Sequence, residues 1–129
     1  MIPTIAPLYA GLLALVYVGL SGWVIRVRVR QKVLSGDNGD PVMINAMRTH
    51  ANFAEYVPLA LILIVLAEAQ GTPAAALHAL GAALLLARIM HAVGLGRQPH
   101  IPALRGGGAA LTFLVLLLAG AANIGHALL

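Results

Sequence analysis

The sequence predicts an all-α integral membrane protein, built as an antiparallel four-helix bundle. Its composition is the first indication: 60% of the 129 residues are hydrophobic and 9% are charged, whereas a soluble domain carries about 25% charged residues. The second is four long apolar stretches, each near the roughly 20 residues that a membrane-spanning helix needs. The third is the short connections, which favour antiparallel neighbours. We expect one domain, residues 1–129, with spans of about 3–28, 42–69, 74–95 and 104–128.

The first span follows from residues 2–25, which contain no Asp, Glu, Lys or Arg. A cleaved signal peptide is the alternative, and it would have a shorter apolar core with positive charge in front of it. Here the positive charges come after the apolar stretch, as Arg26, Arg28, Arg30 and Lys32. The stretch is therefore expected to be a transmembrane helix.

Turn signals separate the later spans. The segment SGDNGDP ends with Asp40 and Pro41, which fit a helix N-cap followed by proline at the first helical position. The segment QGTP offers Thr72 and Pro73 for the same two roles ahead of the third span. Pro58 lies inside the second span and predicts a kink or local loosening of that helix.

The basic residues predict the orientation in the membrane. They gather in and beside the connections 30–40 and 96–104, whereas the connection at 70–73 has no Lys or Arg. Cytoplasmic connections carry the excess of Lys and Arg in membrane proteins. We therefore expect both basic connections in the cytoplasm and both termini on the opposite side of the membrane.

The residue inventory argues against several function classes. The chain has no cysteine, so it offers neither a disulfide nor a thiol nucleophile, and any reacting thiol must come with a substrate. Its histidines form no His-x-x-x-His or carboxylate–histidine set, so no metal site is expected. The net charge of +4 is explained by the basic residues that set the orientation in the membrane. The chain has no stripe of alternating basic and aromatic residues, so nucleic-acid binding is not expected.

Polar side chains enter the second span on one face. In MRTHANFAEYVPLAL, residues 47–61, steps of three and four residues align Arg48, Asn52, Glu55 and Tyr56. Ionisable side chains inside a span are costly, so they usually face a cavity or a partner. This face of the second span is therefore a candidate site.

The third span adds Arg88 and His91, which are three residues apart in its cytoplasmic half. One interpretation is structural: Glu55 and Arg88 form a buried pair, and Asn52 hydrogen bonds within the bundle. The other is an anionic ligand, because arginines outnumber acids in this half and clamp carboxylates in a bidentate way. The arginines concerned are Arg30, Arg48, Arg88 and Arg105.

Two smaller features carry structural expectations. Glu68 lies near the end of the second span, where the membrane interface suits a charged side chain. The glycines at 106–108 are expected to allow close contact between helices.

The segment RTHANFAEYVP, residues 48–58, resembles the second-helix signature of the MAPEG family, the membrane-associated proteins in eicosanoid and glutathione metabolism. The pattern is an arginine, an asparagine four residues later, then a glutamate and a proline at further steps of three. The resemblance extends over the whole chain, with R-x-x-H on the third helix and an arginine opening the fourth. The short loops resemble the small bacterial branch, which implies a bacterial inner membrane.

The resemblance implies a homotrimer that binds glutathione between neighbouring subunits, near the cytoplasmic side. The residues that match glutathione-binding positions are Arg30, Arg48, Asn52, Glu55, Tyr56, Arg88 and His91. Arg105 resembles the fourth-helix arginine that stabilises the thiolate, so it is the expected catalytic residue. The arginines would meet the carboxylates of glutathione, Glu55 its ammonium group and Arg105 its thiol, whose pKa a nearby cation lowers.

The implied activity is that of a glutathione-dependent transferase or peroxidase, acting on lipophilic electrophiles or lipid hydroperoxides that arrive from the membrane lipid. Glutathione is the co-substrate, and no metal is expected. One departure bears on activity: HAVGLGRQP, residues 91–99, has no tyrosine where well-characterised members carry them. The alternative is a non-enzymatic lipid- or thiol-binding membrane protein of the same fold. A small transporter or structural protein that shares only the bundle is the third interpretation.

Overall fold

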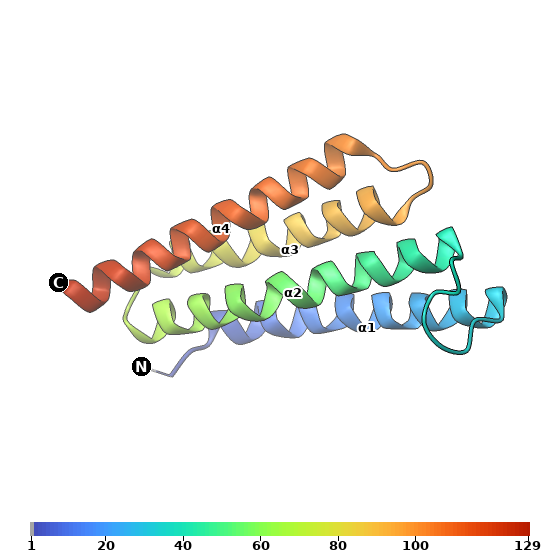
Figure 1. Ribbon diagram of the computed structural model, residues 1–129. Coiled ribbons are helices and arrows are strands. Elements are labelled where there is room, and N and C mark those ends of the chain that lie inside the picture. The colour runs from blue at the N-terminus through green and yellow to red at the C-terminus, as the bar shows by residue number, and fades with distance from the viewer. Residues whose placement is uncertain (1) are drawn as a thin grey trace.

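The computed structural model describes residues 2–129 and consists of four long helices (Figure 1). They are α1 (Ile5–Gln31), α2 (Pro41–Ala69), α3 (Ala74–Gly96) and α4 (Pro102–Leu128). Each is long and apolar enough to cross a membrane. The predicted fold class, an all-α four-helix membrane bundle, is confirmed. α1 runs three residues past the end expected for the first span.

The helices alternate in direction, so the two chain ends and the turn at 70–73 lie at one end of the bundle (Figure 1). The connections 32–40 and 97–101 lie at the other end, which we call the basic end. α2 and α3 are central, because α1 and α4 each pack against both of them. Within residues 2–129, α1 and α4 do not pack against each other. The basic end of α2, α3 and α4 is where the candidate site lies.

Of the two N-caps predicted from the turn residues, one is observed and the other is not. Asp40 caps α2 as predicted, because its carboxylate accepts a hydrogen bond of 2.8 Å from the backbone N–H of Met43. The expectation that Thr72 caps the third span is wrong. Helix α3 begins after Pro73 without a side-chain cap, and the Thr72 hydroxyl is buried without a hydrogen-bond partner in residues 2–129. α2 continues as one helix through Pro58.

Glycine brings α3 and α4 together at the level of the site. A Cβ on Gly108 would lie 2.6 Å from both the Ala87 carbonyl oxygen and the His91 nitrogen. A Cβ on Gly94 would collide with the backbone of Arg105. Of the three glycines expected to allow close contact, Gly108 therefore does so, whereas Gly106 faces open space. The close approach sets the distance between His91 on α3 and Arg105 on α4.

Glu68 ties the end of α2 to the start of α1. Its carboxylate is buried, with 4% of the residue exposed. It accepts hydrogen bonds of 2.6, 2.7 and 2.7 Å from the backbone N–H groups of Thr4, Ile5 and Ala6. These are the N–H groups that a helix start leaves without an internal partner, and the helix dipole favours an anion there. Glu68 is thus more than the helix-end residue expected, because it caps a different helix.

Candidate ligand-binding site

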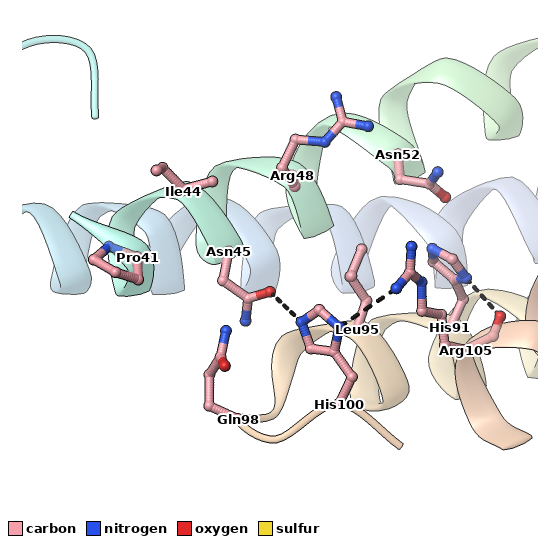
Figure 2. Close-up of a pocket in the computed structure, with 10 residues that line it drawn as sticks. All are labelled: Pro41, Ile44, Asn45, Arg48, Asn52, His91, Leu95, Gln98, His100 and Arg105. Carbon is pink, nitrogen blue, oxygen red and sulfur yellow. Dashed lines mark hydrogen bonds between the residues drawn. The ribbon is translucent and has the colours of Figure 1, made fainter. Parts of the chain in front are cut away.

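A cavity of about 380 Å³ opens at the basic end, between α2, α3, the 97–101 connection and the start of α4 (Figure 2). Most of the residues that line it are polar, and none carries a carboxylate. They are Pro41, Ile44, Asn45, Arg48, Asn52, His91, Leu95, Gln98, His100 and Arg105. Two arginines and two histidines without an acid among these ten residues make the cavity suited to an anion.

His100 links α2 to α4 across the mouth of the cavity (Figure 2). Its Nε2 is 3.0 Å from the side-chain oxygen of Asn45, and its Nδ1 is 3.4 Å from the Arg105 guanidinium. The amide nitrogen of Asn45 donates to the Gly96 carbonyl at 3.0 Å, which turns the Asn45 oxygen toward His100. The imidazole of His100 therefore joins α2 to the start of α4, and Asn45 joins α2 to the end of α3.

His91 occupies the inner wall of the cavity. It is buried, and its Nδ1 lies 3.0 Å from the backbone carbonyl oxygen of Arg105. A carbonyl only accepts, so Nδ1 carries the proton and Nε2 is an acceptor in the neutral ring. That Nε2 is buried and has no hydrogen-bond partner in the described chain. A buried acceptor that lacks a partner is available to a ligand donor.

Arg88 lies behind this wall and does not line the cavity. It is 1% exposed, and its guanidinium donates to the Asn52 side-chain oxygen at 2.6 Å and to the Thr112 hydroxyl at 3.3 Å. The rings of Phe53 and Tyr56 flank it, each with its centroid 5.9 Å from the guanidinium carbon. The suggested Glu55–Arg88 pair is therefore wrong, whereas the suggested hydrogen bonding of Asn52 within the bundle is confirmed.

The remaining predicted residues lie away from the Arg105–His100 pair. Arg48 lines the cavity, but its side chain is exposed and its guanidinium points away from that pair (Figure 2). Glu55 is exposed on α2, and Arg30 is exposed at the end of α1. Neither lines the cavity. The single chain thus gathers Arg48, Asn52, His91 and Arg105 around the cavity and leaves Arg30 and Glu55 on its surface.

Comparison with known proteins decides the family. A family model described as "MAPEG family" matches residues 6–125, nearly the whole chain. The chain belongs to the MAPEG family. It is also 34% identical over 120 residues to "Inner membrane protein YecN" of Escherichia coli K12, an alignment that covers 93% of this chain and 90% of YecN. The YecN of Escherichia coli O6:H1 matches equally well.

Sequence reasoning missed part of the cavity of this MAPEG protein. Asn45 is seven residues before Asn52, so it lies on the predicted polar face two helical turns earlier, and its spacing was a usable signal. His100 and Gln98 lie in the 97–101 connection. No periodicity places the side chains of a connection, so only the folded chain brings His100 between Asn45 and Arg105.

Proposed function

We propose that this MAPEG protein is a membrane-bound, glutathione-dependent transferase or peroxidase that acts on lipophilic electrophiles or lipid hydroperoxides. The observation that carries the proposal is the cavity at the basic end, which is lined by Arg105 and His91 and has no acid among its ten lining residues. Glutathione brings what the chain lacks: two carboxylates for the arginines and a thiol for a protein without cysteine.

The chemistry assigned to the residues is acid–base and electrostatic. Arg105 stabilises the thiolate, because a cation next to a thiol favours the ionised and nucleophilic form. The thiolate then forms a bond to carbon of the electrophile and displaces its leaving group, such as chloride. With a hydroperoxide it attacks one oxygen, the oxygen–oxygen bond breaks, an alcohol leaves and the sulfur keeps the other oxygen. Asn52 is held by Arg88 at 2.6 Å, so its amide offers an ordered hydrogen-bonding group to the glutathione backbone.

A homotrimer is part of the same proposal. Glu55 is exposed about 21 Å along α2 from its start, near the middle of a 29-residue helix. A charged side chain at that depth costs about 2.5–3.5 kcal/mol on insertion scales unless it faces a partner or a polar cavity. A neighbouring copy that covers the face of Arg48 and Glu55 would remove this cost.

A second candidate is a non-enzymatic lipid- or thiol-binding protein of the same fold. The observation in its favour is that none of the ten residues that line the cavity carries a hydroxyl group, which could help to ionise a thiol. The α3 residue Leu95 contributes an apolar side chain to this lining. Tyr9 and Tyr17 lie on α1, and Tyr56 packs against Phe113 and Arg88. No tyrosine is among the cavity residues.

The variant Arg105→Ala separates the two candidates, with Arg97→Ala as the matched control. Arg97 is exposed at the start of the 97–101 connection and does not line the cavity. We expect the purified protein to conjugate glutathione to a chloronitrobenzene. Arg105→Ala should keep glutathione binding but lose at least roughly a hundredfold in rate, while Arg97→Ala stays near wild type. Binding of glutathione or lipid without turnover by the wild type would support the second candidate.

We further propose a bacterial inner-membrane location, as the name of YecN states for that protein. The basic end then faces the cytoplasm, because Lys and Arg are retained on that side. This orientation presents the cavity to the cytoplasmic pool of glutathione.

A further inference from the structure

The protonation of His100 is fixed by its neighbours. The Asn45 amide nitrogen donates to the Gly96 carbonyl, so the Asn45 oxygen faces His100 and only accepts. His100 must therefore donate through Nε2–H. Arginine only donates, so the Nδ1 that faces the Arg105 guanidinium must carry a lone pair. The structure thus holds a neutral imidazole whose basic nitrogen is turned toward the proposed thiolate-stabilising arginine.

From this geometry we infer that His100 is the proton acceptor for the thiol that binds beside Arg105. The S–H bond breaks, its electron pair stays on the sulfur, and the proton passes to Nδ1 of His100 directly or through one water. The resulting thiolate pairs with the Arg105 guanidinium, which gives up its 3.4 Å contact with Nδ1. The imidazolium keeps its Nε2–H bond to Asn45. The inference rests on the proposed function.

The surroundings favour His100 over His91 for this role. The charged groups that face the cavity are Arg48 from α2 and Arg105 from α4, with His91 as the titratable group from α3. His91 is buried, bonds to the Arg105 backbone and is three residues from Arg88, so a proton on it adds an unscreened positive charge. His100 is half-buried at the mouth of the cavity, where an imidazolium stays partly hydrated.

Proton counting tests the inference. The variant is His100→Asn, whose side-chain oxygen replaces Nδ1 as an acceptor for Arg105 but cannot take a proton. His100→Gln is the second variant, should His100→Asn fail to fold, and His126→Asn at the far end of α4 is the control. Glutathione is titrated calorimetrically into each purified protein in two buffers of different ionisation enthalpy, and thiolate is followed by its ultraviolet absorbance.

In wild type the proton stays on the protein, so thiolate formation is nearly independent of pH while His100 is neutral. In His100→Asn the proton goes to buffer. That variant should release about one more proton per bound thiolate than wild type, and its thiolate fraction should rise about tenfold per pH unit. The His126→Asn control should match wild type.

The outcomes separate the two proposals. Wild type that neither binds glutathione nor shows thiolate overturns the proposed function, and this inference with it. Binding and thiolate formation with equal proton release in wild type and His100→Asn overturns the inference alone. A change in proton release with His91→Asn but not with the His100 variants also overturns the inference alone, because the acceptor is then His91.

Discussion

The guanidinium of Arg88 on α3 donates a hydrogen bond of 2.6 Å to the side-chain oxygen of Asn52 on α2. The bond is short and charge-assisted, and such bonds are about twice as strong as neutral ones. Arg88 does not line the cavity, whereas Asn52 does. Arg88 therefore positions the side chain of a cavity residue, Asn52, and it also joins the two central helices of the bundle.

We predict that Asn52→Leu destabilises the bundle by about 1.5–3 kcal/mol, because a buried guanidinium loses its short acceptor. Thermal unfolding in detergent measures the change. The matched control is Asn123→Leu, which removes an amide that donates only to backbone carbonyls, those of Leu63 and Ala119. Adding Arg88→Met to Asn52→Leu should restore part of the loss, since the unpaired charge is then removed. Strictly additive losses would contradict a direct coupling of the two residues.

A second prediction concerns the contact between α3 and α4. Gly94→Ala places a methyl group against the backbone of Arg105, and overpacking of this kind costs about 1–3 kcal/mol. Because it also displaces Arg105, glutathione-dependent activity should fall together with the melting temperature. The control is Gly106→Ala, where a methyl group meets nothing within 4 Å. It should be neutral or stabilise α4 by about 0.5–1 kcal/mol.

A third prediction tests whether Glu55 binds the ligand or stabilises the bundle. Glu55→Gln should weaken glutathione binding by roughly 10–100-fold, because the ligand ammonium loses its ionic acceptor. The melting temperature should not fall, since Glu55 is exposed and the Arg88 guanidinium bonds to Asn52 instead. Titration of glutathione gives the affinity. Unchanged affinity with a lower melting temperature would show that Glu55 has a structural role.

The orientation is tested with single cysteines, since the natural chain has none. Ser35→Cys lies in the connection at the basic end and Gln70→Cys in the opposite turn, and both positions are exposed. In intact cells we expect a membrane-impermeant thiol reagent to label Gln70→Cys and not Ser35→Cys. Lysed cells, in which both should react, are the control. The reverse pattern in intact cells would invert the proposed orientation.

The spans were predictable because the sequence concentrates its few charges between them. The Asp40 cap was predictable because its side chain bonds to Met43, only three residues ahead. The Thr72 cap was wrong because Pro73 has a ψ of 138°, outside the helix, so α3 starts one residue too late for Thr72 to cap it. The Asn52 hydrogen bond was suggested by spacing. Its partner, Arg88, could not be predicted, because spacing within one helix does not define which residues of two helices meet at the same depth.

His100 shows more clearly which part of the site could not be predicted from the sequence. Its position depends on how the 97–101 connection closes between α3 and α4, and that closure depends on the approach of the two helices at Gly94 and Gly108. These contacts are tertiary, so local sequence patterns do not contain them. The sequence therefore indicated the cations of the site, but not the imidazole that bridges Asn45 and Arg105.

The cap that Glu68 places on α1 has a consequence for how the chain enters the bilayer. The carboxylate and its three N–H donors are more than sixty residues apart in sequence, and they meet only if the start of α1 and the end of α2 emerge on the same face of the membrane. If α1 inserted upside down, Glu68 would be left near the lipid without donors, and the first turn of α1 would lose its acceptor. Only the native orientation of α1 relative to α2 therefore satisfies both the Glu68 carboxylate and the N–H groups of the first turn of α1.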